Sequence, residues 1–192
     1  MLRKLTVDDV DDLLMITGNP DVVRFIPGMI QDKDILVSWS RSLPSTDHKF
    51  MVLKSTASLQ NERIVTGKSD DGCADNTHAA GEVVIGECSL DNSGEIGLML
   101  LPEYWRKGYG TATVQQLMKI AFDLGLSEVS AQSVAENKAC IGLFRSLGFT
   151  VNGMGWFVSE GAIYSPESGM EMSQGMIVLH RNLQDKKTVS EG

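Results

Sequence analysis

The sequence predicts an α/β fold in which a mixed sheet is flanked by helices, and three observations lead to that prediction. Strand-like and helix-like segments alternate along the second half of the 192-residue chain. An apolar run at residues 96–101 is broken by Pro102, as is typical of a central strand. Apolar residues then recur at helical spacing until Gly125 provides a stop signal. This stripe consists of Val114, Leu117, Met118, Ala121 and Leu124.

The first part of the chain is expected to form a short strand and two helices. Residues 2–6 predict the strand, and residues 7–16 predict a helix with Thr6 as its N-cap. A second helix is expected over residues 32–43. The side chains expected to face the core are Val7, Val10, Leu13 and Leu14 in the first helix, and Ile35, Leu36 and Trp39 in the second.

The middle of the chain predicts a hairpin that carries an insertion. Residues 50–54 and 82–90 have strand composition, whereas residues 55–81 are polar and small, as is typical of a flexible insertion. The acidic residues of this insertion lack the ligand spacing of a calcium loop. A turn signal at residues 91–94 then leads into the central strand at residues 95–101.

The last part predicts a strand at residues 128–134 and a helix at residues 137–147 that buries Ile141, Phe144 and Leu147. Weaker patterns follow: a strand at 150–158, a loop at 160–175 and a closing strand at 176–180. We therefore expect one domain over residues 1–183 and a frayed tail over residues 184–192.

Composition excludes several classes of function. A net charge of −8 disfavours a nucleic-acid-binding protein and suits a cationic partner. No apolar run reaches the roughly 18 residues of a membrane span, and the acidic start lacks a signal-peptide pattern, so a cytoplasmic location is expected. The three cysteines lack CxxC spacing and the three histidines are scattered, so no metal site is expected.

The turn between the central strand and the helix has the composition of an anion site. It reads Arg106-Lys107-Gly108-Tyr109-Gly110-Thr111, with two cations and two glycines directly before a helix start. Unpaired amides and the dipole at a helix N-terminus favour bound phosphate. The turn lacks the GxxxxGK[ST] pattern of a P-loop and the third glycine of a dinucleotide fingerprint.

These residues resemble the pyrophosphate loop of the GNAT N-acetyltransferase superfamily, which has the pattern [QR]xxGx[GA]. Trp105 stands where Gln or Arg is usual, and together with Pro102 it is similar to the RimJ/RimL-like branch of ribosomal-protein N-terminal acetyltransferases. A second resemblance lies at Asn137–Ile141 and Leu147-Gly148-Phe149, which are similar to the family's NxxSxxxxxxLGF helix.

The resemblance implies the GNAT acyl-CoA N-acyltransferase fold and acetyl-CoA as cosubstrate. It implies that Asn137 reaches the pantetheine arm, and that the central strand splays from the next one so that its backbone groups pair with pantetheine. Those backbone groups belong to Met99, Leu100 and Leu101. The pyrophosphate would be held by Arg106, Lys107, Gly108, Tyr109, Gly110 and Thr111.

The resemblance also offers candidates for proton transfer. Acetyl transfer to an amine needs a base, and Glu95 and Glu160 are the two carboxylates at suitable positions. Many relatives have an acidic tyrosine where this chain has Phe144, so the leaving thiolate would take its proton from Cys140 or from water. Because Cys140 has no evident histidine partner, direct attack in a ternary complex is expected instead of an acyl-cysteine intermediate.

Three functions remain open from the sequence. The first is an acetyl-CoA-dependent N-acetyltransferase acting on a protein N-terminus, a polyamine or another small amine, as a monomer or homodimer. The second is a catalytically silent module that binds acyl-CoA. The third is a structural α/β domain, which would not bind CoA.

Overall fold

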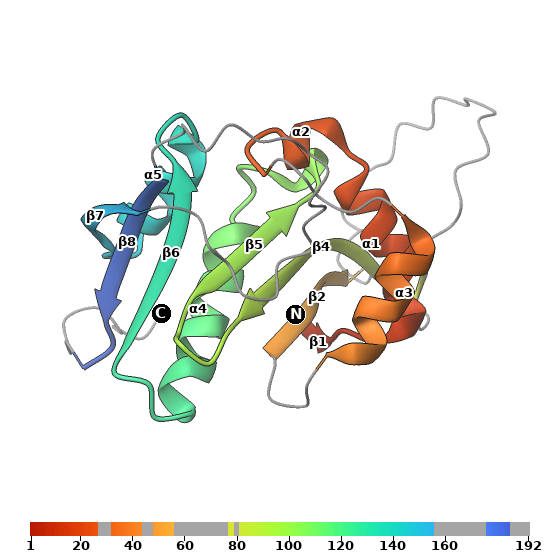
Figure 1. The fold of residues 1–192 in the computed structure, drawn as a ribbon, viewed down its shortest axis with the longest axis horizontal. Coiled ribbons are helices and arrows are strands. Elements are labelled where there is room, and N and C mark those ends of the chain that lie inside the picture. The colour runs from red at the N-terminus through yellow and green to blue at the C-terminus, as the bar shows by residue number, and fades with distance from the viewer. Residues whose placement is uncertain (27–31, 44–47, 56–76, 79–80, 156–175, 185–192) are drawn as a thin grey trace.

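The computed structural model describes residues 1–26, 32–43, 48–55, 77–78, 81–155 and 176–184. Its strands form two sheets (Figure 1). The first contains β1 (Leu2–Lys4), β2 (His48–Ser55), β4 (Glu82–Leu90) and β3 (Thr77–His78) in that order, with β5 (Ile96–Leu100) also paired to β4. The second contains β6 (Glu128–Val134), β8 (Met176–Asn182) and β7 (Thr150–Gly155) in that order. Within both sheets the paired strands are antiparallel.

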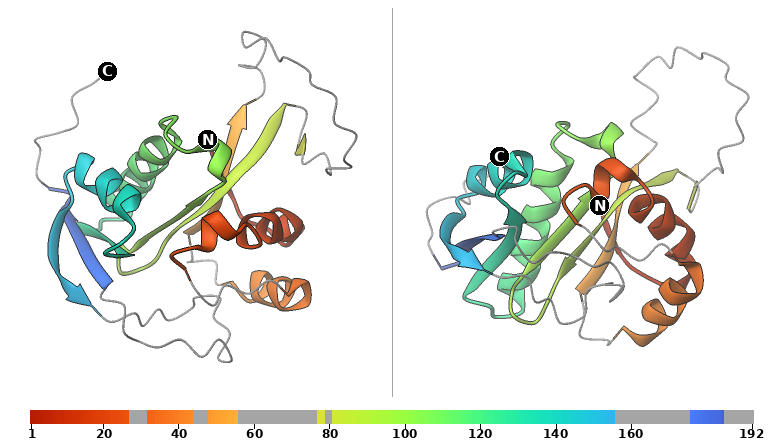
Figure 2. Two further views of the ribbon diagram at one scale, coloured as in Figure 1. Left: turned by 90° about the horizontal axis from the view of Figure 1, so that it is seen from above. Right: turned by 45° about the horizontal axis from the view of Figure 1, so that its top comes forward.

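Helices cover opposite sides of the sheets, as the view from above shows (Figure 2). One side carries η1 (Val7–Asp9), α1 (Val10–Thr17), α2 (Pro20–Val23) and α3 (Lys33–Ser42). The other side carries α4 (Tyr109–Asp123) and α5 (Lys138–Ser146), and η3 (Pro102–Tyr104) links β5 to the loop before α4. No helix in the described part of the chain is long and apolar enough to cross a membrane.

The core has two clusters, one on each side of the sheet. The cluster under α4 and α5 contains Val114, Leu117 and Phe144 together with Cys88 of β4. The cluster under α1 and α3 contains Leu13, Ile16 and Leu36 together with Met51, Leu53 and Val84 of the sheet. Because the two clusters separate the faces, each residue of a central strand can be assigned to one side.

The structure confirms most predicted elements and corrects several details. The strands at residues 82–90 and 128–134 have the predicted bounds. The first helix is instead a 3-10 turn followed by α1, and this change of pitch leaves Val7 37% exposed. Ile35, in the first turn of α3, is 50% exposed, whereas its neighbour Leu36 is buried in the core. Leu124 follows the last residue of α4 and is 52% exposed.

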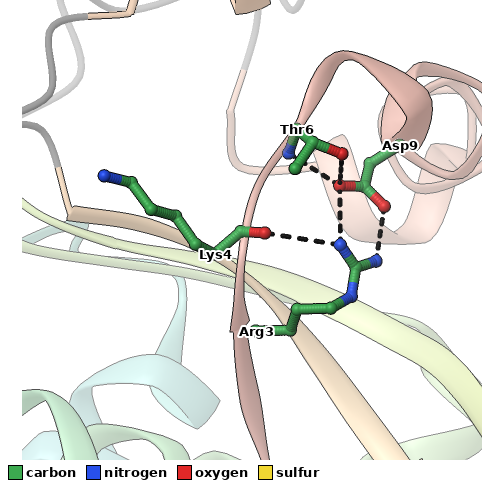
Figure 3. Close-up of polar contacts among 4 residues, drawn as sticks. All are labelled: Arg3, Lys4, Thr6 and Asp9. Atoms are coloured by element: carbon green, nitrogen blue, oxygen red, sulfur yellow. Dashed lines mark hydrogen bonds and ion pairs between the residues drawn. The ribbon is translucent and has the colours of Figure 1, made fainter.

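A buried carboxylate fixes the start of α1 to β1 (Figure 3). Asp9 is 1% exposed and accepts hydrogen bonds from the Thr6 amide at 2.7 Å and hydroxyl at 2.9 Å. Arg3 adds a two-pronged ion pair at 2.5 and 3.1 Å. Burial raises the pKa of Asp9, but the bonds from Arg3 and Thr6 outweigh it, so the pKa lies below its ordinary value.

Candidate active site

The two sheets touch at one end and diverge at the other. β5 and β6 are joined by one isolated parallel bridge between Glu95 and Ser130, where the Ser130 amide donates to the Gly94 carbonyl at 2.9 Å. Beyond this bridge β5 pairs with β4 and β6 pairs with β8, and the two strands separate along their length (Figure 1). The predicted splay is therefore present, and beyond the bridge no strand of the described residues pairs with this edge of β5.

Alternation along β5 decides which peptide groups face this edge. The Leu101 amide donates to the Ile85 carbonyl at 3.0 Å, so its N–H faces β4. Because hydrogen-bonded pairs alternate in an antiparallel ladder, Met99 also turns its peptide groups towards β4, and Leu98 and Leu100 turn theirs towards the split. The carbonyl of Leu100 is occupied by the Trp105 indole N–H at 2.7 Å. Of the three residues predicted to pair with pantetheine, only Leu100 therefore turns its peptide groups towards the split. Leu98, which was not predicted, does so as well.

The loop at the open end of the split presents backbone donors. Arg106 and Gly108 have positive φ values of 58° and 87°, and Gly108 is the N-cap of α4 without a side chain to cap it. The first bond of the helix runs from the Ala112 amide to the Gly108 carbonyl at 3.0 Å, so the amides of residues 109–111 precede that bond. Arg106 and Lys107 are exposed beside them. This combination suits a phosphate.

The two glycines of this loop have different roles. A Cβ added to Gly108 would meet nothing within 4 Å, so the surface above the turn is open. A Cβ added to Gly110 would lie 3.1 Å from Leu143 of α5 and 3.6 Å from Leu98 of β5. Gly110 therefore lets the start of α4 approach the strand and the neighbouring helix closely.

Asn137 and Cys140 lie at the start of α5, beyond the end of β6. The Asn137 Oδ1 accepts a hydrogen bond from the Cys140 amide at 3.1 Å and caps the helix, which leaves its NH2 group to donate elsewhere. Burial raises the pKa of the Cys140 thiol, and a hydrogen bond with Ser133 lowers it by less, so the net pKa is raised. A thiol with a raised pKa is a poor nucleophile at neutral pH. Phe144 is 2% exposed and packs edge-on against Phe149 in the core.

Glu95 lies at the closed end of the split, on the side of α1 and α3. Its Oε2 accepts a hydrogen bond from Gln132 of β6 at 2.7 Å. Partial burial raises its pKa, the Gln132 bond lowers it, and Asp91 raises it further, with a net rise. The Gln132 Oε1 is buried and has no hydrogen-bond partner in the part of the chain that the structure describes. The sequence analysis did not identify Gln132, because the pairing is between residues 37 apart.

Other expectations lie outside the site or outside the described residues. Glu160 is among residues 156–175, which are not described, as is most of the predicted insertion. Glu87 of β4 is a buried carboxylate that the sequence analysis also missed. Among the described residues no group of three or more His, Cys, Asp or Glu side chains is arranged to hold a metal ion.

Comparisons with known proteins identify the family of the chain. A family model described as the acetyltransferase (GNAT) domain matches residues 1–150. The uncharacterized N-acetyltransferase YoaA of Bacillus subtilis (strain 168) is 33% identical over 61 residues, which are 31% of this chain and 34% of YoaA. That match thus spans only about a third of the curated relative.

Solved structures share the fold at low sequence identity. An acetyltransferase (GNAT family) from Bacillus anthracis superposes with a TM-score of 0.66 at 15% identity, covering 96% of this chain and 95% of that one. Spermidine N-acetyltransferase from Vibrio cholerae, solved in complex with CoA and spermine, gives a TM-score of 0.64 at 14% identity, covering 95% of both chains. At these identities the likeness shows the fold.

Proposed function

The chain belongs to the GNAT acetyltransferase family, and from this premise we propose that it transfers an acetyl group from acetyl-CoA to a primary amine. The observation that carries the proposal is the edge of β5 that no described strand pairs with, which leads to a helix N-terminus whose first amides have no partner among the described residues. An extended thioester can pair with the strand edge while its diphosphate binds the amides and the cations of Arg106 and Lys107.

The roles of the binding residues follow from their positions. Gly108 and the amides of Tyr109, Gly110 and Thr111 hold the pyrophosphate, and the NH2 group of Asn137 donates to the pantetheine arm. The amides of Leu98 and Leu100 face the split, so they are the donors that would polarise the thioester carbonyl and stabilise the developing oxyanion. Met99 and Leu101 shape the strand but direct their amides to β4.

Proton transfer is proposed to occur without a covalent intermediate. The raised pKa of Cys140 keeps this thiol protonated at neutral pH, so direct attack by the amine is favoured over an acyl-cysteine. A carboxylate on the side of α1 and α3 would take the proton from the acceptor amine. The sequence offers two candidates for this base, Glu95, which lies among the described residues, and Glu160, which does not. The thiolate takes its proton from water or from Cys140.

The acceptor is the finer part of the proposal. The RimJ/RimL-like resemblance of residues 102–109 favours a protein N-terminus, and the fold shared with a spermidine N-acetyltransferase, together with a net charge of −8, favours a small cationic amine. We expect a cytoplasmic enzyme with no metal requirement.

Release of CoA thiol from acetyl-CoA, measured with spermidine, small monoamines and peptides with free N-termini, tests the proposal. Turnover on at least one acceptor is expected, and Glu95→Gln should lower kcat/KM for that acceptor about tenfold without changing acetyl-CoA affinity, since one charged hydrogen bond is lost. Glu160→Gln tests the second carboxylate in the same assay. Lack of acetyl-CoA binding in calorimetry would overturn the proposal.

A second candidate, a silent acyl-CoA-binding module, is favoured by one observation. Phe144 occupies the position of the proton-donating tyrosine of many relatives, and it cannot donate a proton because it has no hydroxyl group. It packs in the core against Phe149. Binding of acetyl-CoA without turnover on any amine of the panel would support this candidate against the first.

A further inference from the structure

Glu87 is a buried carboxylate in the middle of the central sheet. It lies on β4 between Met51 of β2 and Met99 of β5 and is 7% exposed. Met51 and Met99 both contact the core cluster on the side of α1 and α3, and cross-strand neighbours share a face of the sheet. The Glu87 side chain therefore faces the same side as Glu95.

A β-bulge is responsible for this orientation. Val52 of β2 pairs with Gly86 and Leu53 pairs with Val84, so Ile85 is an extra residue in β4. In a regular strand, residues three apart point to opposite faces of the sheet. Ile85 and Cys88 are three apart and yet both belong to the cluster under α4 and α5, so the alternation is broken between them. Without the bulge Glu87 would point into that apolar cluster. Bulges often re-aim a side chain next to an active site.

Glu87 lacks the partners that other buried carboxylates have. Its carboxylate makes no hydrogen bond or ion pair with any residue in the described ranges, whereas Asp9 accepts four bonds from Arg3 and Thr6. Lys49 on the adjacent strand lies instead over the ring of Trp39, 5.3 Å from its centroid. An unpaired buried carboxylate destabilises a fold, so its presence needs a reason other than stability.

The position of Glu87 places it next to the proposed thioester site. Met99, its neighbour on β5, is flanked by Leu98 and Leu100, whose peptide groups face the split. Glu95 lies four residues before Met99, about 13 Å along the strand. Glu87 as a whole is 7% exposed, so the residue is not completely sealed from solvent. The role proposed below requires an amine bound on this face to approach the exposed part of Glu87.

We propose that Glu87, in place of the sequence candidate Glu95, is the carboxylate that takes the proton from the acceptor's ammonium group, and that Glu95 helps to hold the acceptor. The inference rests on the proposed function. Glu87 removes one proton from R-NH3⁺, and the neutral amine then forms the C–N bond to the thioester carbonyl as the C–S bond breaks. The second proton lost from nitrogen neutralises the CoA thiolate, and Glu87 later releases its proton to solvent.

The electrostatic surroundings suit this role. Burial raises the pKa of Glu87, and Lys49 lowers it by a smaller amount. Other titratable groups on the elements of this side are Asp11 and Asp12 in α1, Lys33, Asp34 and Arg41 in α3, and Glu95 and Tyr104. Among the described residues, the charge that acts on Glu87 is that of Lys49 on β2. A carboxylate whose pKa is shifted towards neutrality is a better base near pH 7 than an ordinary one.

Glu87→Gln tests the inference, with Glu82→Gln on the same strand as the matched control. At pH 7 we expect kcat/KM for spermidine or an N-terminal peptide, whichever the wild type uses, to fall about 10²-fold or more in Glu87→Gln and to stay unchanged in Glu82→Gln. The loss should shrink as the pH approaches the pKa of the acceptor amine, because the amine then arrives neutral. Acetyl-CoA affinity should not change.

The outcomes separate this inference from the proposed function. If the wild type turns over an amine and Glu87→Gln has the same pH profile, Glu87 is not the base. If the wild type turns over none, the proposed function itself fails. Should Glu87→Gln not fold, carbon NMR of the wild-type Glu87 carboxyl decides: its titration must shift when acceptor binds with CoA, and an unchanged titration would refute the role.

Discussion

At the scale of single residues, Gly108 sets the direction of the amides at the start of α4. Its φ of 87° belongs to the left-handed region, and Gly108→Ala should cost about 1–2 kcal/mol in stability without any steric clash. The strained turn should also weaken acetyl-CoA binding about tenfold in calorimetry. Gly142→Ala in the middle of α5, where a Cβ meets nothing within 4 Å, is the control and should bind acetyl-CoA normally. Equal affinities in both variants would contradict the assigned role of Gly108.

Asp9 gives a prediction on stability against pH. Because its pKa is lower in the folded protein than in the unfolded chain, its contribution is present above the unfolded pKa, about 3.9, and is lost as the pH falls through the folded value. Asp9→Asn should therefore lower the free energy of unfolding by about 2 kcal/mol at pH 7 and by much less in acid. Urea denaturation at both pH values measures the difference.

Asp11→Asn is the matched control for Asp9→Asn. Its ion pair with Lys33 joins two exposed side chains, at 75% and 58% exposure, and such pairs contribute less than about 1 kcal/mol. A loss in Asp11→Asn as large as that in Asp9→Asn would show that the effect comes from general charge and not from the buried cluster.

At the scale of elements, the start of α4 is held between β5 and α5. Gly110→Ala should push Leu143 away by a few tenths of an ångström, since the new Cβ would lie 3.1 Å from it, and should lower both the melting temperature and acetyl-CoA affinity. Leu143→Ala in the same chain opens space and should restore part of the acetyl-CoA affinity. Thermal unfolding and calorimetry of the two single variants and the double variant measure this coupling; strictly additive effects would contradict the contact.

Element bounds were predictable wherever local signals were strong. The Asp91–Gly94 turn and the apolar runs on either side of it placed β4 and β5 almost to the residue. The sequence could not reveal that Ile85 is an extra residue in β4, because a bulge depends on pairing with β2, 32 or more residues away. The face of Glu87 depends on that bulge, which is why this carboxylate was missed.

At the scale of the whole molecule, the divergence of the two sheets should be visible in hydrogen exchange. In the free protein the amides of Leu98 and Leu100 should exchange faster than those of Met99 and Leu101, which bond to β4. Acetyl-CoA should slow the first pair only, because it would pair with the open edge. Spermidine alone is the control and should leave all four rates unchanged. Equal protection of all four amides in the free protein would contradict an unpaired edge.

The sequence by itself determined the order of strands and helices, the Gly-Tyr-Gly turn with its two cations, and the family that these motifs indicate. All of these are read from neighbours within a few residues, where periodicity and turn chemistry act directly. Only the tertiary structure decided which amides of β5 turn away from β4, that Gln132 binds Glu95, and that Glu87 is buried without a hydrogen-bond partner among the described residues. Each depends on strands that are distant in sequence, and the pairing of those strands sets the face, the burial and the partners of every side chain between them.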